Sequence, residues 1–90
     1  MFEKLIAILT KSKEEKCDLS VAYPKVRNED RLAGVTDYTE LDKAYKLING
    51  YEALVTKLWR EGELEALEEF CKLFEAEDSA GIREFVGKWQ

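Results

Sequence analysis

The chain has 90 residues, of which 46% are hydrophobic and 37% are charged, and its formal net charge is −5. A chain of this length and composition folds as one domain, residues 1–90, around one modest core, which excludes a disordered tail. It contains no histidine, which removes the commonest general base and excludes Glu-x-x-His di-metal sites.

The first predicted element is an amphipathic helix over residues 2–15. Apolar side chains recur there at helical spacings of three and four: Phe2, Leu5, Ile6 and Leu9. The longest apolar run near the start, residues 5–9, is shorter than a signal-peptide core and far below the ~20 residues of a membrane span. We therefore expect no targeting segment, no membrane partner and a cytoplasmic location.

The next segment changes its period. From Cys17 to Pro24 apolar and polar residues alternate, and a period of two indicates extended backbone with one buried face. Pro24 cannot donate to a sheet ladder, and no second strongly β-patterned run is present to pair with this one. The pattern favours an extended packed segment over residues 17–26, with a two-stranded element as the alternative, and then a polar loop over residues 27–36.

A long helix is predicted over residues 38–61, where the apolar period returns to 3.6. Asp37 followed by Glu40 fits a capping box at its start, with Thr36 as the alternative cap. The apolar phase continues past Gly50, which favours one helix that another helix approaches closely at this glycine. The alternative is two helices hinged there.

Two further helices are predicted over residues 63–76 and 79–89. Gly62 is expected to end the preceding helix, and Asp78 or Ser79 to cap the last one. The fold class that follows is mainly α: a single-domain bundle of about four helices with a short extended segment near residues 17–35.

Acidic residues concentrate on the first of these two helices. Residues 61–78 hold eight acidic residues and one basic residue, a net −7, so the remaining 72 residues sum to +2. Several of the glutamates share one helix side, because spacings of three and four are neighbours there. The predicted partner-binding residues combine this acidic face with two flanking aromatics: Glu61, Glu65, Glu68, Glu69, Tyr51 and Trp59. The alternatives are a solvated face without a role, a DNA-like charge array and a divalent-metal site.

The sequence gives no support for a catalytic, nucleotide-binding or direct nucleic-acid-binding site. No glycine-rich phosphate loop is present, so we expect no nucleotide cofactor and no catalytic or metal-ligating residues. Lysines and arginines are too dispersed to predict direct nucleic-acid binding. Cys17 and Cys71 are expected to be reduced and structural, with a disulfide between them as the alternative.

The sequence therefore predicts a non-enzymatic protein-binding module or small regulator. Its partner would be another protein with a basic surface, and a homodimer or other homo-oligomer is compatible with the ten aromatic residues. The alternative is an acidic DNA mimic that inhibits a nucleic-acid-binding protein or enzyme, because a carboxylate array can imitate a phosphate backbone.

Overall fold

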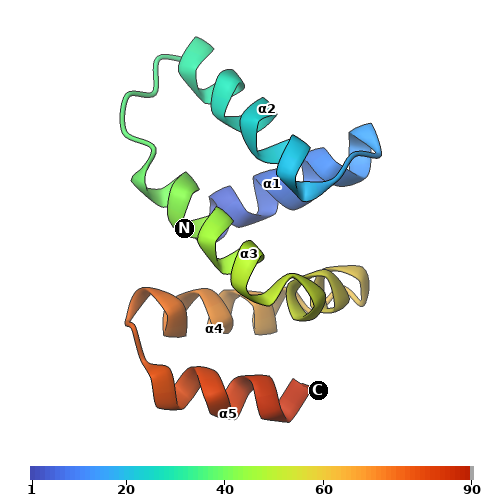
Figure 1. Cartoon of the computed structure of the whole chain (residues 1–90), viewed down its shortest axis with the longest axis vertical. Coiled ribbons are helices and arrows are strands. Elements are labelled where there is room, and N and C mark those ends of the chain that lie inside the picture. The colour runs from blue at the N-terminus through green and yellow to red at the C-terminus, as the bar shows by residue number, and fades with distance from the viewer. Residues whose placement is uncertain (90) are drawn as a thin grey trace.

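The computed structural model describes residues 1–89, and these residues form five α-helices (Figure 1). The helices are α1 (Phe2–Glu15), α2 (Leu19–Leu32), α3 (Thr39–Arg60), α4 (Leu64–Glu75) and α5 (Ser79–Trp89). The mainly α bundle is thus confirmed, although the described residues contain five helices where about four were predicted. No helix among them combines the length and the apolar composition needed to cross a lipid bilayer.

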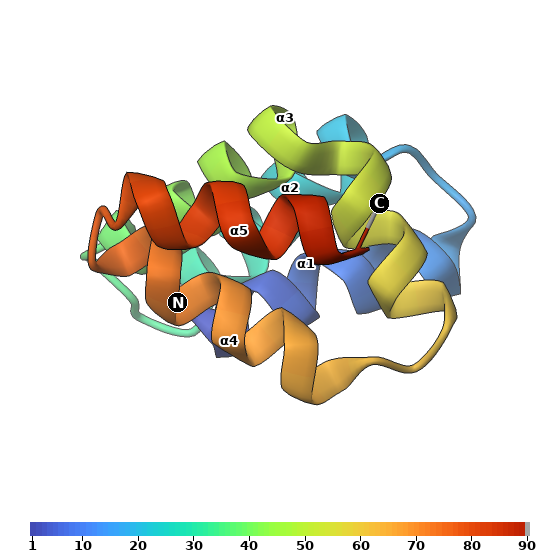
Figure 2. The ribbon, with the colours of Figure 1, turned by 90° about the horizontal axis from the view of Figure 1, so that it is seen from below.

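The helices form two hairpins joined by α3. Helices α1 and α2 lie at one end of the long axis, α4 and α5 lie at the other, and α3 runs between them (Figure 1). The view from below shows α4 and α5 side by side beneath α3 (Figure 2). The molecule measures 39 × 26 × 19 Å. Each of the five helices contributes buried side chains to one shared core.

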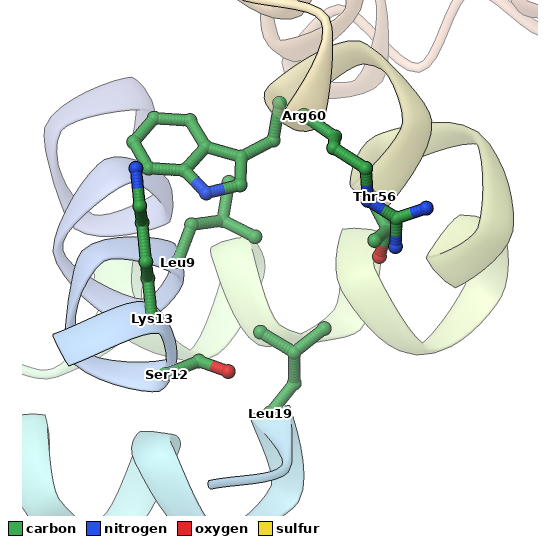
Figure 3. Close-up of a pocket in the computed structure, with 7 residues that line it drawn as sticks. Leu9, Ser12, Lys13, Leu19, Thr56 and Arg60 are labelled. Atoms are coloured by element: carbon green, nitrogen blue, oxygen red, sulfur yellow. The ribbon is translucent and has the colours of Figure 1, made fainter. Parts of the chain in front are cut away.

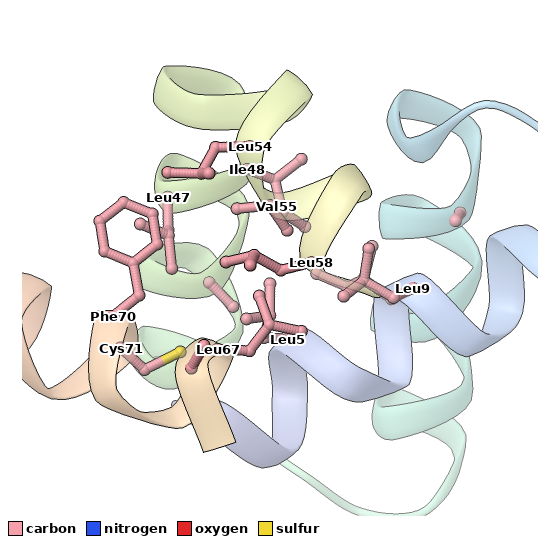
Figure 4. Close-up of a cluster of buried hydrophobic side chains, with 14 of the residues drawn as sticks. Leu5, Leu9, Leu47, Ile48, Leu54, Val55, Leu58, Leu67, Phe70 and Cys71 are labelled. Carbon is pink, nitrogen blue, oxygen red and sulfur yellow. The ribbon is translucent and has the colours of Figure 1, made fainter. Parts of the chain in front are cut away.

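The core lies where α1, α3 and α4 meet (Figure 4). Its largest fully buried side chains come from these three helices: Leu5, Ile8, Leu41, Leu47, Ile48, Val55, Leu58, Leu67, Phe70 and Cys71. No polar or charged side chain of the described residues is buried with them. Burial of apolar surface is therefore the main stabilising contribution at the centre of the bundle.

The extended segment predicted near residues 17–35 is wrong, because most of these residues form helix α2, Leu19–Leu32. The alternation that indicated a strand conceals a helical stripe at spacings i, i+3, i+4 and i+7: Leu19, Ala22, Tyr23 and Val26. Ala22 and Val26 are buried, and Pro24 lies exposed within the helix. Proline has no N–H, so the carbonyl of Ser20, four residues before Pro24, receives no helical hydrogen bond. Ser20 is also exposed, so water can donate a hydrogen bond to this carbonyl.

The polar loop predicted over residues 27–36 is also mostly helical, and its acidic residues reach across to α1. Lys4 Nζ lies 2.9 Å from Asp30 Oδ2, and Lys11 Nζ lies 2.6 Å from Glu29 Oε2. The carboxylates of Glu29 and Glu15 raise the pKa of Lys11, because both hydrogen-bond to its charged ammonium. These cross-helix pairs add to the burial of Ala22 and Val26, which holds α2 against α1.

Helix α3 differs from its prediction in three respects. Tyr51 has non-helical dihedrals (φ −141°, ψ 38°), so the helix is kinked there, as in the hinged alternative. The predicted close approach at Gly50 is wrong, because a Cβ built there meets nothing within 4 Å. The capping box is wrong too: Asp37 accepts a hydrogen bond from Thr39 N at 2.9 Å, whereas Glu40 pairs with the N-terminal ammonium at 2.6 Å.

The turns around α4 match their predictions. Gly62 adopts φ 74°, a left-handed conformation that favours glycine, and the next N–H, of Glu63, bonds to the Leu58 carbonyl at 2.9 Å. This pattern ends α3 at Arg60 and turns the chain into α4. At the start of α5, Asp78 Oδ1 accepts a hydrogen bond from Gly81 N at 2.9 Å, which confirms the predicted cap.

The two glycines of α5 provide a matched pair of substitutions. A Cβ at Gly81 would lie 2.5 Å from Asp78 Oδ2 and 2.8 Å from Leu73 Cδ2, whereas one at Gly87 meets nothing within 4 Å. Alanine has a higher helix propensity than glycine at both positions. At position 81, however, its Cβ displaces the carboxylate of Asp78 that caps the helix. We expect Gly81→Ala to be less stable than Gly87→Ala by about 1–2 kcal/mol in urea unfolding. Equal stabilities would contradict the close approach at Gly81.

Candidate functional site

The acidic residues form an exposed face on α4. This helix buries Ala66, Leu67, Phe70 and Cys71 in the core and packs Leu73 and Phe74 partly against it, so its other positions face solvent. Glu65, Glu68 and Glu69 lie at those positions, and Glu61 lies exposed at the end of α3. We call these four glutamates the acidic face. The structure therefore places all four predicted glutamates on the surface.

The acidic face is poorly neutralised compared with the N-terminal half of the chain. Cations pair with the carboxylates of Glu15, Glu29, Asp30 and Glu40. Within the acidic face, the described residues provide one ion pair, between Lys72 Nζ and Glu68 Oε1 at 3.6 Å. An exposed pair one helical turn apart contributes only a few tenths of a kcal/mol. The charges of Glu61, Glu65 and Glu69 are therefore open to a cationic partner.

The two predicted aromatics do not extend the acidic face. Tyr51 is half-buried, with its ring 5.1 Å from that of Phe70 at 74°, an edge-to-face contact between α3 and α4. Trp59 is also half-buried and lines a separate cleft on the α1 side of α3. The structure thus places Glu65, Glu68 and Glu69 on one side of α4 and the two aromatics elsewhere.

This separate cleft has a volume of about 350 Å³ and opens between the end of α1, the start of α2 and the second half of α3 (Figure 3). Three apolar side chains, two hydroxyl groups and two cations line it: Leu9, Leu19, Trp59, Ser12, Thr56, Lys13 and Arg60. Lys13 and Arg60 lie on opposite sides of the cleft, and neither forms an ion pair with the residues that the structure describes. We call it the cationic cleft.

One polar group of the cationic cleft is already occupied. Ser12 Oγ donates a hydrogen bond to the Cys17 carbonyl at 2.5 Å, which ties the α1–α2 turn to the end of α1. The cleft therefore combines an apolar surface with two cations whose hydrogen-bonding capacity is unused by the described protein groups. Such a lining suits an apolar group that carries negative charge nearby.

Sequence reasoning identified Trp59 but missed the rest of the cationic cleft. The cleft depends on α2 folding as a helix, because Leu19 reaches it only from the first turn of α2. The prediction of extended backbone over residues 17–26 therefore left out the wall of the cleft that Leu19 forms. A sequence signal did exist in the helical stripe that begins at Leu19.

No family model, curated protein or solved structure matches the chain significantly. Among residues 1–89 no three His, Cys, Asp or Glu side chains are grouped to hold a metal ion. The acidic face is a ridge on one helix, whereas closed sites for hard cations draw oxygen ligands from several directions.

Proposed function

We propose that this chain is a non-enzymatic protein-binding module whose acidic face captures a partner protein through a basic surface. The observation that supports the proposal is the contrast in ion pairing. On α1 and α2 the carboxylates of Glu15, Glu29 and Asp30 pair with lysines. On the acidic face only Glu68 pairs with a lysine, among the residues that the structure describes. Exposed uncompensated charge accelerates and orients encounter with a protein of opposite sign.

The acidic face supports an ordinary protein contact better than it supports DNA mimicry. Helix α4 has 12 residues and is therefore about 18 Å long. B-DNA carries roughly ten phosphate charges over that distance. The acidic face offers four carboxylates, one of which is paired with Lys72. Its charge is too sparse to reproduce a phosphate backbone, so the mimic remains the second candidate.

The proposal predicts that removing these charges weakens partner capture. In the test, tagged protein is incubated with an extract of cells that express the chain, and its partners are identified by mass spectrometry. The test variant neutralises the acidic face: E61Q/E65Q/E68Q/E69Q. The control variant removes the same charge from other exposed positions: E3Q/E14Q/E52Q/E84Q. We expect partners to be lost with the test variant and kept with the control.

A captured partner then allows a quantitative test. At low salt we expect the association rate to fall roughly tenfold or more for the test variant, and its dependence on salt to flatten. Equal capture and equal salt dependence for both variants would remove the acidic face from consideration. Addition of duplex DNA separates the two candidates, because a DNA mimic must compete with DNA for the partner and an adaptor need not.

A further inference from the structure

The lining of the cationic cleft suits an occupant that combines an apolar group with negative charge. Its apolar surface, from Leu9, Leu19 and Trp59, suits one branched or aromatic side chain. Lys13 and Arg60 border that surface from opposite sides, so the occupant should also carry carboxylates on both sides of the apolar group.

The chain itself carries such a segment. Leu64 begins α4, is 47% exposed and is flanked by Glu63 and Glu65. The other exposed large apolar side chains of the described residues, Val21 and Leu32, lack this pattern. Neither has a carboxylate on either side in the sequence. Leu64 with its two glutamates, which we call the acidic knob, is therefore complementary to the cationic cleft in apolar character and in charge.

The knob and the cleft lie close together along the chain, but Leu64 and its flanking glutamates do not line the cleft of their own molecule. Arg60 and Leu64 are four residues apart, so their Cα atoms are at most about 15 Å apart. The turn at Gly62 leads the chain from α3 into α4, which packs against α3 and also contacts α1 (Figure 2). In a twofold-symmetric pair of chains, the knob of each copy could enter the cleft of the other. Two such contacts close symmetrically, as in an isologous dimer.

We propose that the cationic cleft binds the acidic knob of a second copy of this chain, forming a twofold-symmetric dimer. Each Leu64 enters the other copy's cleft beside Trp59, while Glu63 and Glu65 contact Lys13 and Arg60. The dimer is weak, because two small contacts bury less than the ~1,200 Å² of standard interfaces. The inference goes beyond the proposed partner binding and involves Glu65 as the one shared residue.

Exchange of charges between two variants tests this pairing. The cleft variant is K13E/R60E, the knob variant is E63K/E65K, and self-association is measured by sedimentation equilibrium. Each variant alone places like charges in both contacts, so we expect its association to weaken at least tenfold. In an equimolar mixture, one copy of each variant restores opposite charges in both contacts. We therefore expect the mixture to associate with wild-type affinity to within about threefold.

An apolar substitution provides a second readout. Leu64→Ser should also weaken association, whereas Leu32→Ser, at a leucine that is 73% exposed, should not change it. Circular dichroism verifies that every variant is folded. A wild-type protein that stays monomeric up to about 1 mM would overturn the dimer, as would a mixture that associates no better than its components. Capture by E68Q/E69Q protein, which leaves knob and cleft intact, reports on the proposed function independently.

Discussion

We expect Phe70→Ala to lower the free energy of unfolding by about 3–5 kcal/mol, because it removes the ring that joins three helices. Phe70 is 0% exposed. Its ring stacks on that of Phe85 in α5, with centroids 4.7 Å apart and an interplanar angle of 9°, and meets Tyr51 of α3 edge-on. Each such aromatic pair contributes roughly 0.5–1.5 kcal/mol beyond the area it buries.

The loss is large relative to the whole stability of the chain. A domain of 90 residues has an unfolding free energy of roughly 5–13 kcal/mol. Helix α5 packs mainly on α4, with Phe85 as its buried residue, so it depends on Phe70 more than the other helices do. We therefore expect α5 to lose its protection from amide hydrogen exchange first.

Urea unfolding followed by circular dichroism measures this loss, with Phe74→Ala as the matched control. Phe74 lies one turn further along α4 and is half-buried, so its truncation should cost about 1–2 kcal/mol. Phe70→Leu keeps most of the volume and should cost less than the alanine. A loss below about 1 kcal/mol for Phe70→Ala would mean that the ring is not at the centre of the core.

Strong apolar periodicity made four of the five helices predictable. In α1 and α4 the buried residues recur at three and four, and in α3 the same pattern persists over 22 residues. The cap at Asp78 and the glycine turn at Gly62 were also predictable, because each depends only on residues that are close in the sequence. Local information of this kind is sufficient wherever one helix face is clearly apolar.

Helix α2 was not predictable in the same way, because its stability depends on α1. Its sequence contains a proline and few large apolar residues, and the local pattern resembles a strand. The features that override it are long-range: the ion pair of Lys4 with Asp30, 26 residues away, and the burial of Ala22 and Val26. Such contacts appear only once both helices are placed.

The candidate site, like the fold, was predictable only in part. Exposure of the acidic face follows from the period of α4, which buries the opposite side of the helix. The aromatic part was not predictable, because the kink at Tyr51 and the position of Trp59 depend on how α3 packs against α4 and α1. The cationic cleft likewise requires three helices, so no single stretch of sequence displays it.

We expect Cys71 to react with a thiol reagent at least ~1,000-fold more slowly than Cys17 in the folded protein at pH 8. Both cysteines are free, which is contrary to the disulfide alternative. Burial raises the pKa of the Cys71 thiol from 9.0 to about 12, so its reactive thiolate is about a thousandfold scarcer. Cys71 is also 1% exposed, whereas Cys17 is partly exposed. The reagent therefore reaches Cys71 only when the core opens.

Single-cysteine variants separate the two rates. Cys71→Ala leaves Cys17 to report the fast reaction, and Cys17→Ser leaves Cys71 to report the slow one. In concentrated urea both thiols should react at similar rates, because unfolding removes the difference in burial. Comparable rates for the two variants without denaturant would contradict the placement of Cys71 in the core.

The same pKa predicts how stability changes at alkaline pH. Above about pH 9 the unfolded chain loses the Cys71 proton, whereas the folded chain keeps it until about pH 12, so the folded state binds more protons in this window. The unfolding free energy must therefore fall as the pH rises, by up to about 1.4 kcal/mol per pH unit from this thiol. Lysines and tyrosines also titrate there, so the comparison is between wild type and Cys71→Ala in urea unfolding. The slope should be shallower in the variant, because alanine has no proton to lose, and parallel slopes would refute the effect.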